Sequence, residues 1–145
     1  MIGVLGGTSA GQMNVTRLPV FYSGFPAGTS MMAHRHLTQC FRSHRFARFD
    51  FESKEKNIKR YGTEQPPDYP LDRISNQHIA LISGSGNDLL SMPADVNRLR
   101  KALKVKLMDD YVIPINDWTH FDYLLSVNAG RVMIARILKL LSRYR

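Results

Sequence analysis

The chain of 145 residues has a single cysteine, Cys40, so no disulfide can form within it. It has no run of about 18 apolar residues, the length that a membrane-spanning helix needs. Its first residues lack the basic start and the apolar stretch of a signal peptide. No internal repeat and no low-complexity tract is visible. These absences favour an ordinary folded domain.

Positive charge, in contrast, is abundant. Lys and Arg number 20 against 12 Asp and Glu, and the formal net charge is +8. Such a charge is compatible with nucleic acid, an anionic membrane surface or an acidic partner. Hydrophobic residues make up 43% of the chain, which at this length predicts one buried core.

The organisation of the chain changes near Ile74. Up to that residue the sequence is irregular and polar, and the turn-rich stretches FPAGTS and TEQPPDYP frame a basic segment. Residues 34–51 could form a helix, although the phenylalanines there do not keep to one face. This part of the chain therefore gives no clear fold.

After Ile74 the pattern becomes regular. Short apolar runs predict strands over 78–84 and 109–117, and helical periodicity predicts helices over 91–103 and 128–145. Strand, helix, strand, helix is the order of a parallel sheet covered by helices, so the predicted fold class is α/β. The residues of the last helix that we expect to face the core are Val132, Ile134, Ile137, Leu138 and Leu141.

The sequence GTSAG around Ser9 is a literal match to G-x-S-x-G, the nucleophile elbow of serine hydrolases. An elbow requires a buried strand before the serine and a helix after it. The eight residues before Ser9 hold only three strand-like residues, and QMNVTRLPV after the motif forms helices poorly. The context favours a flexible stretch of small residues over a nucleophile.

Two loops at the predicted strand ends carry Asp88, in SGSGNDLLSMP, and His120, in INDWTHFDYLL. The carboxyl ends of parallel strands lie at one edge of a sheet, where open α/β sheets bind ligands. An aspartate followed by a histidine is the second half of a Ser…Asp…His triad, in which the aspartate orients the imidazole and the histidine carries the proton. The alternatives are a turn aspartate bonded to its own backbone and a histidine packed among aromatic residues.

The basic segment offers a function of a different class. Basic residues from Arg35 to Arg60 alternate with aromatic ones, as in proteins that bind single-stranded nucleic acid. Acidic residues interrupt the run, and a solvated face explains such a stretch equally well. His34, His36 and His44 lie in the same segment, but no cysteine or carboxylate completes a metal-binding pattern, so we expect no metal and no cofactor.

Five blocks of the sequence resemble the acid lipase family, which includes the gastric and lysosomal lipases and their arthropod relatives. In order, they are NVTRLPVFYSGFPAGTS, RHLTQCFRSHRFARFDF, QPPDYPLDRI, SGSGNDLLSMPADV and WTHFDYLL. They occur in the family's order along the stretch from Asn14 to the end, which is about nine-tenths of the chain. The resemblance implies an α/β-hydrolase with a cap domain that cleaves carboxylic esters of lipids. It also assigns the triad acid to Asp88 and the triad base to His120. Ser85 departs from the family, since a second glycine is usual there.

The resemblance further implies that this chain is a carboxyl-terminal part of an acid lipase. Residues 1–73 would be a remnant of the cap, and residues 74–145 the last part of the hydrolase core. Ser9 would then lie in cap sequence and be a decoy, with the nucleophile in a missing amino-terminal part. The expected partners are a lipid ester and a lipid surface rather than nucleic acid, in a secreted or lysosomal protein. Asn14, in the sequon Asn-Val-Thr, is a candidate glycosylation site.

Overall fold

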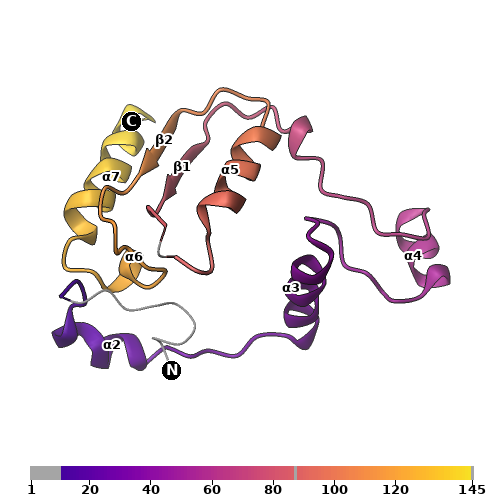
Figure 1. Ribbon diagram of the computed structural model, residues 1–145, viewed down its shortest axis with the longest axis horizontal. Helices are drawn as coiled ribbons and strands as arrows, with labels where there is room; N and C mark the ends of the chain where they lie inside the picture. The colour runs from indigo at the N-terminus through magenta and orange to yellow at the C-terminus, as the bar shows by residue number, and fades with distance from the viewer. Residues whose placement is uncertain (1–10, 87, 145) are drawn as a thin grey trace. The chain divides into compact units, whose positions relative to one another are not determined.

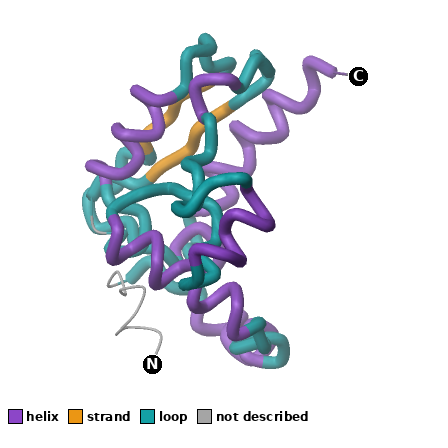
Figure 2. The backbone as a smooth tube through the Cα atoms, turned by 90° about the vertical axis from the view of Figure 1, so that its right-hand side faces the viewer, coloured by secondary structure: helices purple, strands orange, loops and turns teal. Residues whose placement is uncertain are grey.

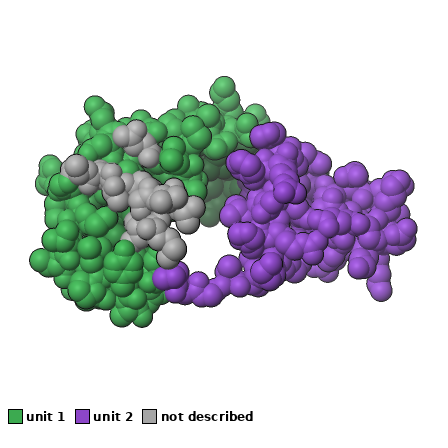
Figure 3. Space-filling model, turned by 60° about the horizontal axis from the view of Figure 1, so that its bottom comes forward, with its two compact units in different colours: residues 1–25, 72–145 green, residues 26–71 purple. Residues whose placement is uncertain are grey.

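The computed structural model describes residues 11–86 and 88–144 (Figure 1). The chain divides into two compact units, which Figure 3 shows in different colours. Unit 1 comprises residues 1–25 and 72–145, and unit 2 comprises residues 26–71.

Unit 2 contains the helices α3 (Met31–Ser43) and α4 (Lys54–Tyr61). The Ser30 hydroxyl caps α3 by accepting a hydrogen bond from the Ala33 backbone N–H at 3.0 Å. The helix ends where His44 adopts the left-handed conformation, with φ of 53°. A helix over the whole of residues 34–51 is therefore wrong, because the chain turns at His44.

Unit 1 is built on a parallel sheet of two strands, β1 (Ala80–Ser83) and β2 (Asp109–Val112), drawn in orange in Figure 2. Ala80 pairs with Asp109 and Ser83 with Val112. Helix α5 (Pro93–Ala102) connects the two strands. The parallel pairing and the connecting helix were predicted from the sequence and are confirmed. Unit 1 thus mixes helices with a small parallel sheet, as expected for part of an α/β fold.

Further short helices complete unit 1. They are a 3-10 turn (Val15–Arg17), α2 (Leu18–Tyr22), a second 3-10 turn (Leu71–Arg73, at the junction with unit 2), α6 (Asp122–Leu125), a π-helix (Gly130–Ile134), α7 (Ala135–Leu141) and a last 3-10 turn (Ser142–Tyr144).

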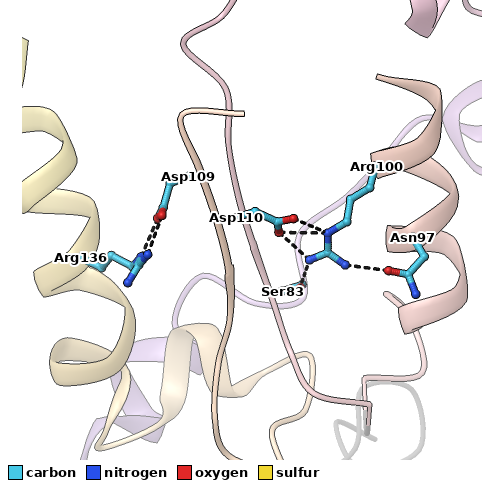
Figure 4. Close-up of polar contacts among 6 residues, drawn as sticks. All are labelled: Ser83, Asn97, Arg100, Asp109, Asp110 and Arg136. Atoms are coloured by element: carbon cyan, nitrogen blue, oxygen red, sulfur yellow. Dashed lines mark hydrogen bonds and ion pairs between the residues drawn. The ribbon is translucent and has the colours of Figure 1, made fainter. Parts of the chain in front are cut away.

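Helices α5 and α7 lie on opposite faces of β2, and each is bound to it by an arginine (Figure 4). Asp109 and Asp110 are consecutive in the strand, so their side chains point to opposite faces. Arg100 of α5 binds both carboxylate oxygens of Asp110, at 2.6 to 3.0 Å. Arg136 of α7 binds both oxygens of Asp109 at 2.5 Å. Two bidentate ion pairs therefore hold the two helices against the sheet.

The core of unit 1 lies just beyond the carboxyl end of β2. Ile113 and Trp118 are fully buried, and Ala129 packs against them. The partly buried residues around this cluster are Ile82, Tyr111, Ile115, Tyr123, Val132 and Met133. The core thus sits under the loop that carries His120.

The expected inward face of the last helix is partly wrong. Ile134, Leu138 and Leu141 are exposed, by 42%, 60% and 60%, whereas Leu140 is buried. The helix has two adjacent apolar stripes, so the periodicity of its sequence does not show which stripe is buried. Arg136 forms an ion pair with Asp109 of β2, and Leu140, one turn after Arg136, is therefore on the buried side.

Candidate functional site

Asp88 lies in the loop that leaves β1, and its side chain is only 1% exposed. One carboxylate oxygen, Oδ1, accepts hydrogen bonds from the backbone N–H groups of Leu90, at 2.9 Å, and Ser91, at 3.0 Å. These bonds fix the carboxylate within its own turn, as the turn alternative proposed. The second oxygen, Oδ2, remains available to another residue.

His120 lies in the loop that follows β2, directly before α6, and its side chain is 43% exposed. Its Nδ1 lies 3.1 Å from Asp88 Oδ2, although the two residues are 32 positions apart in the sequence. A carboxylate accepts hydrogen bonds, so this contact fits an imidazole that donates from Nδ1. Nε2 makes no hydrogen bond within the part of the chain that the structure describes, and it can accept a proton.

Three hydrogen bonds, in two contacts, hold the loops of Asp88 and His120 in place. The Ser85 hydroxyl donates to the Ile115 carbonyl at 2.5 Å and so ties the first loop to the second. Asp122, which is 2% exposed, accepts at 2.7 Å from the Thr119 N–H and at 2.8 Å from the Thr119 hydroxyl. The pattern Thr-x-x-Asp signals this second contact in the sequence, whereas nothing signals the first.

Apolar side chains follow Asp88 in the chain, and aromatic rings lie near the His120 imidazole. Leu89, Leu90 and Met92 follow Asp88 in the chain and are 65%, 58% and 47% exposed. The Phe121 ring lies 5.9 Å from the imidazole, and the rings of Phe21 and Phe25 lie 6.1 and 5.8 Å from Phe121. The surroundings of the imidazole are therefore apolar and partly exposed.

The remaining predicted site residues lie apart from this pair or outside the described part. Ser9 lies outside the described residues. The Asn14 N–H donates to the Leu125 carbonyl at 2.7 Å, and the Asn14 side-chain oxygen accepts at 2.7 Å from the Thr16 hydroxyl. His36 is engaged with the Ala47 carbonyl at 2.8 Å. Among the described residues, no three His, Cys, Asp or Glu side chains gather closely enough to hold a metal ion.

No model of a protein family matches this chain, but individual lipases do. Lipase member N of Homo sapiens is 30% identical over 138 residues, which are 95% of this chain and 33% of that protein. Gastric triacylglycerol lipase of Homo sapiens is 32% identical, over 96% of this chain and 34% of that protein. Lysosomal acid lipase/cholesteryl ester hydrolase of Rattus norvegicus is 29% identical, over 92% and 32%. The resemblance to acid lipases is confirmed, and the chain spans about a third of the length of these relatives.

Proposed function

Because this chain is similar to acid lipases over nearly its whole length, we propose that it supplies the acid–base half of lipid ester hydrolysis. The observation that carries the proposal is the contact between His120 Nδ1 and Asp88 Oδ2 at the carboxyl end of the parallel sheet. Asp88 orients the imidazole, and His120 is the base. Residues 74–145 belong to an α/β-hydrolase core, and residues 1–73 to its cap.

The geometry supports a proton-transfer role for His120. When Nδ1 donates to Asp88, the neutral imidazole has its lone pair on Nε2. Nε2 can then take the proton of a serine hydroxyl as that serine attacks the ester carbonyl, and return it to the leaving alcohol. The buried Asp88 carboxylate stabilises the imidazolium between these two steps.

The nucleophile in this proposal lies in a segment that corresponds to the other two thirds of the relatives. Ser9 takes no part, because it lies before the first matching block, at a place where the family has cap sequence. The substrate is a lipid ester, in agreement with the apolar side chains around His120. The compartment is secreted or lysosomal, as the names of the gastric and lysosomal relatives suggest. None of the described helices is both long and apolar enough to span a membrane.

A chimera tests the proposal. In human gastric triacylglycerol lipase, this chain would replace the matching third, and ester hydrolysis would be measured. We expect activity that Asp88→Asn lowers by roughly 10⁴-fold and His120→Ala by roughly 10⁶-fold, the scale of triad substitutions. Ser9→Ala is the matched control and should leave the activity unchanged. A chimera that folds and hydrolyses esters equally well with and without His120 would contradict the proposal.

The chain alone gives a second test. It should show no labelling by a serine-directed phosphonate, because a base and its orienting acid have no nucleophile to activate. Stoichiometric labelling that Ser9→Ala abolishes would instead make Ser9 the nucleophile.

A further inference from the structure

Tyr123 of α6 lies three residues after His120 and packs between that histidine and the core. Its ring centroid lies 5.7 Å from the Trp118 ring, with the two planes at 87°. It also lies 6.5 Å from the His120 imidazole, with the two planes at 70°. Trp118 is fully buried, so the Tyr123 ring packs against a core side chain.

The hydroxyl end of Tyr123 reaches the loop that carries Asp88. A Cβ atom added at Gly84, the first residue after β1, would lie 3.2 Å from the Tyr123 hydroxyl oxygen and 3.3 Å from Trp118 Cδ1. Any larger residue at this position would force the Tyr123 hydroxyl or the Trp118 ring to move by a few tenths of an ångström. Burial and the charge of Asp88 raise the pKa of the Tyr123 hydroxyl, which a hydrogen bond from the Gly84 backbone partly offsets. The hydroxyl is therefore neutral at ordinary pH and lies within the field of Asp88.

We propose that Tyr123 is a positioning residue that holds the His120 imidazole against Asp88. The ring lies beside the imidazole, at 6.5 Å between centroids, and so limits the rotation of the imidazole away from Asp88. Nδ1 then stays directed at Asp88, and Nε2 stays directed outward. This inference rests on the proposed function of the Asp88–His120 pair, since positioning matters only if the pair transfers a proton.

The contacts assign the holding role to the ring rather than to the hydroxyl. Trp118 and His120 contact Tyr123 through its ring, and Gly84 lies beside its hydroxyl. A phenylalanine at this position would keep the first two contacts, whereas a leucine would lose the planar surface. The two substitutions therefore separate the ring from the hydroxyl.

The test is a ¹⁵N NMR measurement of the histidine rings in the full chain, which reports which ring nitrogen carries the proton. In the wild type we expect His120 in the Nδ1–H form. Tyr123→Leu should turn this into a mixture of both tautomers, and Tyr123→Phe should keep the single form. Tyr61→Phe is the matched control, because the Tyr61 hydroxyl also bonds a backbone group, the Phe49 carbonyl at 2.9 Å, but in unit 2.

Each other outcome overturns the proposal. A single Nδ1–H form in Tyr123→Leu would show that the ring does not hold the imidazole, and a mixture in Tyr123→Phe would place the effect elsewhere. If Tyr123→Leu fails to fold, a measurement on the wild type still tests the packing of Tyr123 against His120. Nuclear Overhauser contacts between the Tyr123 ring protons and the His120 ring are expected, and their absence would contradict the packing.

Failure of the proposed function is distinguishable from failure of this inference. If Asp88→Asn leaves the His120 tautomer unchanged, the Asp88–His120 pair itself is not coupled, and the proposed function fails whatever Tyr123 does.

Discussion

At the scale of single residues, the consecutive residues Asp109 and Asp110 bind two different helices. Asp109 binds α7 and Asp110 binds α5. Asp109 is 13% exposed, and its hydrogen bonds from Arg136 lower the pKa of its carboxyl below the ordinary value of 3.8, against an opposing effect of burial. The guanidinium also lies over the Tyr111 ring, at 4.2 Å. This corner of unit 1 is therefore held by a charged pair rather than by apolar packing.

The lowered pKa predicts how the stability of unit 1 depends on pH. A carboxyl with a lower pKa in the folded state contributes stability above its ordinary pKa, and the contribution is lost as the pH falls through the folded value. Asp109→Asn should therefore melt a few degrees below the wild type at pH 7, and the difference should narrow progressively as the pH falls below about 4. Thermal unfolding followed by circular dichroism across this range measures it.

Asp95→Asn is the control for this experiment. Asp95 is 67% exposed, and its contact with Arg98 is 3.9 Å long, so its removal should change the melting temperature little at any pH. A difference for Asp109→Asn that persists unchanged at pH 3 would show that its charge is not the cause.

Asn14 carries a second prediction at this scale. Its hydroxyl partner Thr16 already bonds the side-chain oxygen, and the neighbouring Val15 is 66% exposed. If the chain is expressed through a secretory pathway, we expect one N-linked glycan at Asn14. An electrophoretic shift that a peptide N-glycosidase removes would report it, and both Asn14→Gln and Thr16→Ala should abolish the shift.

Asn97→Gln is the matched control, because Asn97 lies outside any sequon and should leave the shift intact. A chain that passes through the pathway unmodified would refute the assignment of Asn14.

At the scale of elements, α7 shows how a polar contact selects the buried face of an apolar helix. Arg136 pairs with Asp109, and Leu140, one turn further along the same side, is only 8% exposed. Leu138 lies on the other stripe and is 60% exposed. The ion pair thus fixes the rotation of the helix about its axis.

This rotation predicts unequal effects of two identical substitutions. Leu140→Ala removes buried methyl groups and should lower the free energy of unfolding by about 2–3 kcal/mol. Leu138→Ala removes groups that are already in water and should change it by less than about 0.5 kcal/mol. Urea unfolding of both variants measures the difference. Equal losses would place both leucines in the core and reject the observed rotation.

The elements that the sequence predicts correctly are those with local signals. The strands lie within 78–84 and 109–117, where apolar runs end at glycine or proline, and α5 begins at Pro93, as its sequence indicates. The approach of Asp88 to His120 follows from the same reasoning, because both residues leave neighbouring strand ends. Their catalytic roles stay predictions.

The features that the sequence does not predict are contacts between residues far apart in the chain. No local pattern shows that the Ser85 hydroxyl reaches Ile115, or that the segment at Gln12 pairs with Val127. The role of Tyr123 is hidden for the same reason, since its contact with Gly84 arises only once α6 packs on the end of β1. Tertiary packing decides such contacts, and residue spacing does not encode them.

At the scale of the whole molecule, the net charge of +8 is spread over both units. Unit 1 has 12 Lys and Arg against 7 Asp and Glu, and unit 2 has 8 against 5. Within unit 2, three of the basic side chains are already in ion pairs, which are Arg35–Glu52, Arg45–Asp68 and Lys54–Glu64. The basic segment is therefore partly neutralised by its own acidic residues, and the similarity to lipases does not favour nucleic-acid binding.

This distribution of charge predicts weak and unspecific binding to nucleic acid. A single-stranded oligonucleotide should bind only in the unspecific range, with a Kd of about 10⁻⁴ to 10⁻⁶ M, and without preference for sequence. Raising the salt from about 50 to 200 mM should weaken the binding, because binding of this kind depends on the release of counterions from the phosphates. Fluorescence anisotropy with a labelled oligonucleotide measures the affinity and its dependence on salt.

Charge reversal at Arg60 in unit 2 and at Lys106 in unit 1 should weaken binding equally if only net charge matters. Tight binding that persists at the higher salt concentration and is weakened by Arg60→Glu alone would instead identify a nucleic-acid site on unit 2. Nucleic acid would then replace the lipid ester as the expected partner.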